Sequence, residues 1–466
     1  SSISSSSYAV SSLEANKKYY WRVVAKDPDG ATTSSDTWHF TTNDGKLDFS
    51  GPVYYGDILL VSNESLNSGS TEHTGTLSEE YLQASYAPTP EGLPLDAYAI
   101  NPFIPEPDYV DESMLAYRDP YEIQSMEPLS VGTTKEFWVY NFKTNSRYQI
   151  TATLQYVGSE SEIWAEDTDV ITQSRAAQLG QEFDSVIYPL VTDYFYTPSD
   201  VDGNGRVAIL CFDIQDNFDT HGSYVAGYFD AGDLYNTTYS NRMEIFYIDT
   251  YPLMYYPRSN PPNVSRAFST LVHEFQHMVN FNRNRIVEGG SGMPTWLNEG
   301  MSMAAEHIYG GALSGRISYY NRSSSIQNGH SLLRWGDNGD TLASYALSYL
   351  FLQYVKEQCG RGDSIFREML LDSANDYRAV ENVIRKYVDS KMTFGEFMTS
   401  FRLALLLNES SGLYGFNGGL GSITTRLYTG NGKTLYGGAA LFKQISESFT
   451  DPGNGGSSIQ YVGIYN

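Results

Sequence analysis

Two histidines and a glutamate stand close together in the segment 270–280, TLVHEFQHMVN. The whole chain has only seven histidines. On a helix, residues four apart project from the same face, so His273 and His277 can hold one metal ion between their imidazoles, while Glu274 points toward a water molecule bound to that ion. A catalytic zinc site needs three protein ligands and one open position. The motif therefore predicts a zinc-dependent hydrolase whose third ligand comes from elsewhere in the chain.

The segment 296–306, WLNEGMSMAAE, offers that third ligand in Glu299. It follows the loop 288–295, which is rich in glycine and can reverse the chain. A second helix is expected to begin at Thr295 or Asn298 and to lie beside the first. Such a pair of helices would deliver the glutamate to the two histidines.

An ordinary amphipathic helix with two surface histidines is the alternative interpretation of the motif. The residues around the histidines are mostly apolar, which predicts a helix that is buried on most sides. Buried histidines need hydrogen-bonding or metal partners, so the metal site is the better interpretation. The apolar neighbours are Phe268, Leu271, Val272, Phe275, Met278, Val279 and Phe281.

The two motifs together resemble those of a known group of enzymes. HEFQH followed by WLNEG is similar to the pattern of the gluzincin metallopeptidases, the clan of thermolysin and of aminopeptidase N. The neighbouring segments GYFDAGDLY, EIFYIDTYP and TLVHEFQHMVNF are most similar to the hyicolysin family of secreted bacterial peptidases. The resemblance covers residues 130–360.

The resemblance implies a role for each matching residue. His273, His277 and Glu299 are expected to bind one zinc ion. Glu274 is expected to be the general base that takes a proton from the metal-activated water and passes it to the leaving amine. Glu306 matches the later acid of the pattern and is expected to contact one of the metal ligands without binding the metal itself. A solvated position on the helix surface is the alternative for Glu306.

The negative oxygen that develops in the transition state needs a hydrogen-bond donor. Tyr345, in LASYALSYLF, lies where a relative of the aminopeptidase N type carries its catalytic tyrosine. Its spacing from Glu299 is shorter, however, and the usual Lys-Gly after the tyrosine is absent. Tyr349 and His330 therefore stay alternatives. Because the chain has 38 tyrosines, a purely structural role for Tyr345 in a packed helix is an equal expectation.

The type of peptidase follows partly from what the sequence lacks. The Gly-x-Met-Glu-Asn signature, which recognises a substrate amino terminus in the aminopeptidase N type, is absent, and the segment 243–245 does not replace it. This favours an endopeptidase. The segment 224–230, YVAGYFD, is a candidate edge strand that could pair with an extended substrate. An ordinary loop is the alternative for this segment.

A calcium loop is one interpretation of the segment 200–207, DVDGNGRV. Asp200, Asp202 and Asn204 are alternate oxygen-bearing side chains, and glycine allows the tight turn of such a loop. The pattern is incomplete, because its twelfth position is Cys211 and not the bidentate acid. A simple Asp/Gly turn that leads into a strand is the other interpretation.

The elements around these residues divide the chain into four segments. Residues 1–43 resemble the last two strands of a fibronectin type III module, so the sequence is expected to begin inside such a module; an edge hairpin of the main domain is the alternative. Residues 44–128 are rich in proline and lack periodicity, as in a linker or a wrapping arm. Residues 129–283 carry strand patterns and end in the HEFQH helix. Residues 284–466 are mostly helical with a β-rich end.

The predicted fold class is therefore α+β. Its expected architecture, which the resemblance implies, is that of the two-lobe thermolysin-like metallopeptidases. A mixed-sheet N-terminal lobe and a helical C-terminal lobe would follow a partial β-sandwich strand pair. The motif residues lie at the junction of the two lobes, where clefts usually form.

Composition narrows the class of function. Acidic residues outnumber basic ones by 55 to 30, which argues against a nucleic-acid partner. The longest apolar stretch, 342–355, is interrupted by polar residues and is too short to span a bilayer. Two cysteines, Cys211 and Cys359, permit either one disulfide or two free thiols.

The sequence thus predicts an extracellular or cell-surface bacterial zinc endopeptidase. Its expected partners are a protein or peptide substrate and upstream modules of the same polypeptide. Two other functions stay open. One is an adhesion protein that uses the peptidase fold as a scaffold, and the other is a zinc hydrolase of a non-peptide bond, because the chemistry depends on the site and not on the fold.

Overall fold

The N-terminal lobe is built on a six-stranded mixed sheet with the strand order β13-β14-β11-β10-β9-β8. The three middle strands, β10, β11 and β14, run parallel to one another, and the outer pairings are antiparallel. The strands are β8 (Thr134–Asn141), β9 (Ser146–Val157), β10 (Ser161–Ala165), β11 (Val207–Phe212), β13 (Gly227–Phe229) and β14 (Ile245–Asp249).

The computed structural model describes residues 17–28, 30–35, 38–42, 58–77, 90–102, 104, 111–119, 129–336, 339–417, 419–445, 452–453 and 455–464.

The sheet separates two apolar cores. β11 and β14 are entirely buried, as expected for parallel strands covered on both faces. Because side chains alternate along a strand, Ile209 and Phe246 pack with the helices, whereas Leu210 and Tyr247 pack under the curled strands β8 and β9. The helical face carries α2 (Gln173–Glu182), the π-helical turn η3 (Phe183–Ile187), α3 (Tyr188–Tyr194) and α5 (Phe268–Phe281).

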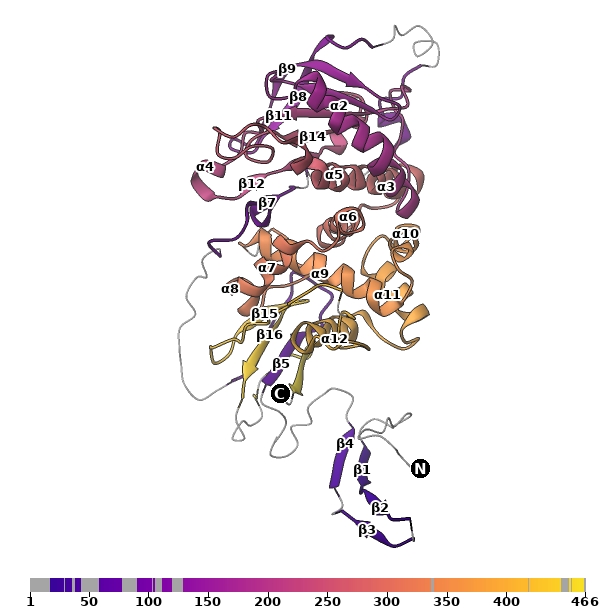
Figure 1. Cartoon of the computed structure of the whole chain (residues 1–466), viewed down its shortest axis with the longest axis vertical. Coiled ribbons are helices and arrows are strands. Elements are labelled where there is room, and N and C mark those ends of the chain that lie inside the picture. The colour runs from indigo at the N-terminus through magenta and orange to yellow at the C-terminus, as the bar shows by residue number, and fades with distance from the viewer. Residues whose placement is uncertain are drawn as a thin grey trace.

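The C-terminal lobe is mainly helical, and its helices are stacked below the sheet in Figure 1. Helix α6 packs between α5 and α9. The close approach of α6 to α9 needs Gly300, because a Cβ atom there would lie 2.6 Å from Leu352 Cδ2. The helices are α6 (Thr295–Gly310), α7 (Ser314–Arg322), α8 (Ser324–Gln327), α9 (Thr341–Cys359), α10 (Ser364–Leu370), α11 (Tyr377–Tyr387) and α12 (Phe394–Leu407).

A small sheet closes this lobe with strands from both ends of the chain. β5 lies between β16 and β17 and pairs antiparallel with each. β5 is fully buried and packs against α12. β6 and β15 form a separate antiparallel pair. These strands are β5 (Ile58–Asn63), β6 (Thr71–His73), β15 (Thr434–Tyr436), β16 (Ala440–Gln444) and β17 (Ile459–Ile464).

The proline-rich segment 44–128 thus follows both lobes where it is described. After β5 and β6 it forms the short strand β7, which pairs parallel with β12 of the N-terminal lobe. The limits of the four segments stay a prediction. The remaining short elements are β7 (Ala99–Ile100), β12 (Tyr224–Val225), α4 (Phe218–His221), η1 (Leu95–Tyr98), η2 (Glu112–Met114), η4 (Ala231–Leu234), η5 (Val264–Ala267) and the π-helical η6 (Asn282–Val287).

Two antiparallel strand pairs form near the N-terminus. β1 pairs with β4, and β2 pairs with β3. A fibronectin identity for this part stays a prediction, and residues 1–16 lie outside the described ranges. The strands are β1 (Lys17–Trp21), β2 (Val24–Lys26), β3 (Thr32–Ser34) and β4 (Trp38–Thr42).

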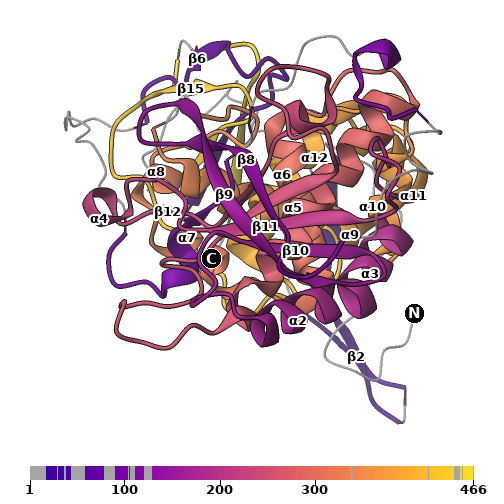
Figure 2. The same cartoon turned by 90° about the horizontal axis from the view of Figure 1, so that it is seen from above.

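The predicted α+β fold class is confirmed. Seen from above, the strands of the curled sheet cross over the helices of the second lobe (Figure 2), an arrangement consistent with a thermolysin-like metalloprotease. Cys211 and Cys359 are both buried free thiols, which settles the cysteine alternatives. Among the helices of the described ranges, none is long and apolar enough to cross a membrane.

Candidate metal centre

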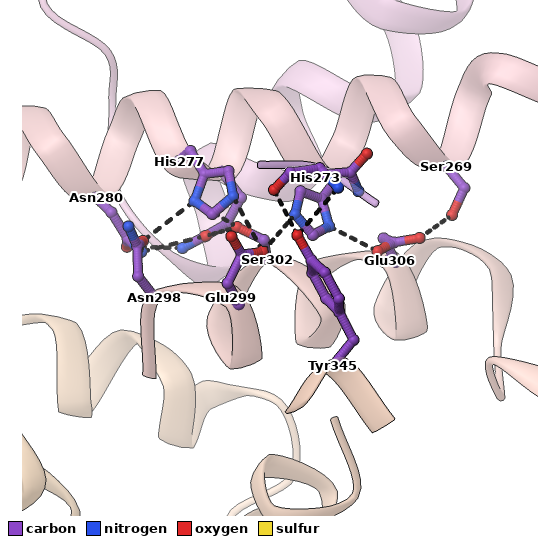
Figure 3. Close-up of polar contacts among 11 residues, drawn as sticks. Ser269, His273, His277, Asn280, Asn298, Glu299, Ser302, Glu306 and Tyr345 are labelled. Carbon is purple, nitrogen blue, oxygen red and sulfur yellow. Dashed lines mark hydrogen bonds and ion pairs between the residues drawn. The ribbon is translucent and has the colours of Figure 1, made fainter. Parts of the chain in front are cut away.

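Helices α5 and α6 run side by side in opposite directions and carry the residues of both motifs (Figure 3). The second helix begins at Thr295, one of the two predicted positions. The π-helical turn η6 and the loop after it reverse the chain between the two helices. α5 is buried on nearly all sides, so its motif faces other protein groups and not bulk water.

The two histidines meet the glutamate of α6 at short range. His273 Nε2 lies 3.1 Å from Glu299 Oε2, and His277 Nε2 lies 3.5 Å from the same oxygen. Potential donor atoms of the three residues all lie within 4.8 Å of one another. Tetrahedral coordination at about 2.0–2.1 Å places two donors about 3.3 Å apart. The structure therefore brings the three predicted ligands to the spacing that a single zinc ion requires.

The carboxylate of Glu306 fixes the orientation of His273 through the ring nitrogen that does not face Glu299. His273 Nδ1 lies 2.7 Å from Glu306 Oε1, and the other oxygen of Glu306 accepts a 2.6 Å hydrogen bond from Ser269 Oγ. A proton on Nδ1 leaves the Nε2 lone pair directed at Glu299. Carboxylate-histidine pairs of this kind set the tautomer of metal-binding histidines. The surface position that was the alternative for Glu306 does not match this geometry, because its side chain is only 12% exposed.

Neutral side chains fix the orientation of His277. His277 Nδ1 lies 3.2 Å from Asn298 Oδ1 and 3.0 Å from Ser302 Oγ. Asn280 donates to the same Asn298 oxygen, and Ser302 donates to Gln276 Oε1. These roles of Asn298 and Ser302 are not among the predictions from the sequence. The spacing of Asn298, Ser302 and Glu306 at intervals of four, which puts them on one helix face, is the signal that could have found them.

The charges in the site show that it is built for a cation. Burial lowers the pKa of His273, but the hydrogen bonds that the carboxylates of Glu299 and Glu306 accept outweigh burial and raise that pKa to about 10. Burial raises the pKa of Glu299, but His277 and His273 outweigh it and the net shift is downward. Glu299 Oε1 has no hydrogen-bond partner among the described residues. Without a metal, a histidine must therefore carry the positive charge that these carboxylates require.

Glu274 follows His273 directly in the chain, and its carboxylate is free of hydrogen bonds to the described residues. It is fully buried, and neither of its carboxylate oxygens has a hydrogen-bond partner among the residues that the structure describes. Strand β13 lies close over it, since a Cβ atom at Gly227 would be 3.1 Å from Glu274 Cγ. Burial raises the pKa of Glu274 to about 7, although His273 and His277 oppose the shift. Such a pKa suits a base that takes and returns a proton near neutrality.

Of the three candidate oxyanion donors, Tyr345 points toward the metal-binding group (Figure 3). Its buried hydroxyl donates to the backbone oxygen of Asn101 at 2.6 Å and accepts from the nitrogen of that residue at 3.0 Å. Glu299 and Glu274 both help to raise its pKa. The hydroxyl of Tyr349 is held by Leu313 N and His307. His330 Nε2 lies 2.8 Å from Ser344 Oγ.

The segment 224–230 forms strands, as predicted. β13 is the edge strand of the six-stranded sheet, and β12 pairs with β7. Ala226 N also donates to the carbonyl oxygen of Ile100 at 2.9 Å. The chain from Ala99 to Asn101 therefore passes between this edge and Tyr345.

The loop 200–207 brings two of the three predicted residues together with an acid that was not predicted. Asp200 and Asp202 group with Glu244, and one oxygen of each lies within 4.8 Å of the others. The Asn204 side chain instead donates to Asp202 and Glu162, and accepts from Arg206 N.

Comparison with known proteins agrees with the geometry of the site. The chain is 39% identical over 410 residues to the neutral metalloprotease ShpI of Staphylococcus hyicus, and the match covers 87% of this chain and 93% of that protein. No protein-family model matches the chain. This identity over nearly the full length of both proteins shows that the chain belongs to the family of the neutral metalloprotease ShpI.

Proposed function

We propose that the chain is a zinc-dependent endopeptidase of the gluzincin type. The ligands are His273, His277 and Glu299. The observation that carries the proposal is the orientation of both imidazoles, whose Nε2 atoms meet one glutamate oxygen while partners hold their Nδ1 atoms. Nitrogen and carboxylate donors at this spacing suit zinc. The unpartnered oxygen of Glu299 and the unpartnered carboxylate of Glu274 fit a site that binds one ion and one water molecule.

The catalytic roles follow from the positions of two further residues. A zinc ion in this site would lower the pKa of a bound water and polarise the substrate carbonyl. Glu274 takes a proton from the attacking water and returns it to the nitrogen of the leaving amine, so the base is regenerated. Tyr345 donates a hydrogen bond to the carbonyl oxygen as negative charge develops there. The contact of its hydroxyl with a backbone carbonyl, that of Asn101, supports this role.

The substrate is proposed to be an extended peptide that pairs with the edge formed by residues 224–230. Strand addition supplies backbone hydrogen bonds without a fixed side-chain sequence. The segment from Ala99 to Asn101 now occupies the neighbourhood of this edge and of Tyr345. It must therefore give way before a substrate backbone can make the same contacts.

The setting of the enzyme is also a proposal. Residues 1–43 would end a fibronectin type III-like module, and residues 44–128 would wrap the peptidase, which occupies residues 129–466. The antiparallel strand pairs near the N-terminus and the course of β5 and β7 along both lobes support this division. The protein would act outside the cell or at the bacterial surface, and proteins or peptides would be its substrates.

The decisive experiment compares the wild type with Glu274→Gln. The wild type should carry about one zinc per chain and cleave casein. Glu274→Gln should keep the zinc and lose about 10²- to 10⁴-fold in kcat, because a positioned base contributes that much. Glu136→Gln, at an exposed position of β8, is the matched control and should behave as the wild type. A wild type without bound zinc would refute the proposal.

A further inference from the structure

A second group of acids lies where the parallel strands β11 and β14 begin. Asp200 and Asp202 are on the loop that leads into β11, and Glu244 directly precedes β14. Because the two strands are parallel neighbours, with Ala208 opposite Ile245, their starting ends lie at the same edge of the sheet. One carboxylate oxygen from each acid lies within 4.8 Å of the other two. The topology thus gathers residues that are far apart in sequence.

Glu244 is the unusual member of this group. It is only 1% exposed. Its Oε1 accepts hydrogen bonds from Ser199 Oγ at 2.6 Å and from Val201 N at 2.9 Å. Its Oε2 is buried and has no hydrogen-bond partner within the described ranges. A buried carboxylate oxygen without a partner is costly, so this atom points to a ligand that is not part of the protein.

The charges around Glu244 point the same way. Burial raises the pKa of Glu244 to about 7, and Asp202 and Asp200, the charged groups that act on it most strongly, contribute to this rise. Asp202 has a cation nearby, because Arg118 Nη2 lies 4.0 Å from its Oδ2, and Lys135 also interacts with it. Neither cation is among the groups that shift the pKa of Glu244 most strongly.

The geometry supplies the acid that the loop sequence lacks. A calcium loop has oxygen donors at alternate positions and a bidentate acid at its twelfth position. Here that position is Cys211, which is buried in the core as a free thiol. Glu244 reaches the loop from the neighbouring strand in its place. Oxygens on opposite sides of a calcium ion lie about 5 Å apart, since each is about 2.3–2.6 Å from the ion, and this fits the 4.8 Å limit.

We propose that Asp200, Asp202 and Glu244 form a second, all-oxygen metal site that binds one calcium ion. The ion would link the loop 200–206 to the start of β14 and would be the missing partner of Glu244 Oε2. The site shares no residue with the group around His273. It therefore does not depend on the proposed peptidase activity.

Calcium binding can be measured without any proteolysis. The full chain is prepared with zinc in a Glu274→Gln background to prevent self-digestion, and calcium traces are removed with EGTA. Isothermal titration with CaCl₂ should show one site, and saturating calcium should raise the Tm by about 2 °C or more. Glu244→Gln in the same background should lose the Tm rise and bind calcium at least about tenfold more weakly.

Two further variants separate a lost ligand from lost folding or lost charge. Glu162→Gln removes a buried negative charge that acts on Asp202, but it leaves all three proposed ligands, so it should keep the calcium response. Asp200→Asn alters an exposed ligand and keeps an oxygen that can accept from Gly205 N, so it should fold and bind calcium more weakly. An EGTA-treated Glu274→Gln protein that shows neither binding heat nor a Tm rise would overturn the proposal. A wild-type response in Glu244→Gln and Asp200→Asn would also overturn it.

Discussion

Replacing Glu306 should weaken zinc binding although its side chain is not proposed as a ligand. The carboxylate lies 2.7 Å from His273 Nδ1, on the side of the ring opposite to the proposed ion. It fixes the tautomer that directs Nε2 into the site and increases the basicity of the ring. Removal of such a partner typically costs about 10- to 100-fold in metal affinity, which corresponds to about 1.4–2.7 kcal/mol.

Graded substitutions divide this cost into its parts. Glu306→Gln keeps an acceptor for the Nδ1 proton but loses the charge, so a loss of about 10-fold is expected. Glu306→Ala removes both and should approach about 100-fold. Ser269→Ala removes one neutral hydrogen bond to the carboxylate, so it should cost about 1 kcal/mol or less. The order of effects, and not only their size, tests the reasoning.

The assay is a competition for zinc against a chromophoric chelator at neutral pH, with kcat/KM on a peptide measured in parallel. Near-UV circular dichroism and the Tm of the metal-free proteins show whether each variant is folded. If Glu306→Ala is folded and binds zinc as tightly as the wild type does, the carboxylate has no part in the site.

Three other predictions test different parts of the molecule. Tyr345→Phe should keep zinc and lower kcat about 10²- to 10³-fold, the usual cost of one oxyanion donor; a kcat within twofold of the wild type would exclude the tyrosine. Ala97→Arg places a large cation at a fully buried position of the segment before Asn101, so it should displace that segment and raise kcat/KM. The control Pro94→Arg, at an exposed position, should leave kcat/KM unchanged. Equal kcat/KM values for the two variants would mean that the segment does not limit access of the substrate to the site. Burial raises the pKa of Glu244 from 4.5 to about 7, so between these pH values the folded state binds more protons than the unfolded state. In EGTA, the free energy of unfolding should therefore fall as the pH rises through this window, by about 3 kcal/mol for this group. Urea unfolding at several pH values should show the fall, and Glu244→Gln should flatten it; an unchanged slope in that variant would contradict the assignment.

The helix pair and its ligands could be predicted because the relevant information is local. The interval between His273 and His277 matches one helical turn, and the apolar residues around them predict burial. The glycine-rich loop before Thr295 accounts for the return of the chain. Each inference uses residues within one or two neighbouring elements, where periodicity and turn chemistry are informative.

The contacts that the sequence did not reveal join residues that are distant along the chain. Nothing in the composition of the loop at Asp202 indicates that Glu244 will lie beside it, because this depends on which strands become neighbours in the sheet. The contact between Asn101 and Tyr345 likewise depends on the path of an aperiodic, proline-rich segment. The sequence placed Asn204 among the calcium ligands from spacing alone, whereas its amide is used in hydrogen bonds to Asp202 and Glu162.

The position of β5 has a consequence for the timing of biosynthesis. This buried strand lies between β16 and β17, which are synthesised much later than β5. About 380 further residues must be synthesised before β16 emerges, which takes about 20–80 s at ordinary translation rates. Throughout this interval the apolar residues 58–61 have neither neighbour. The helical lobe therefore closes only after β16 and β17 have been synthesised, and a chain released earlier would leave an open strand available for aggregation.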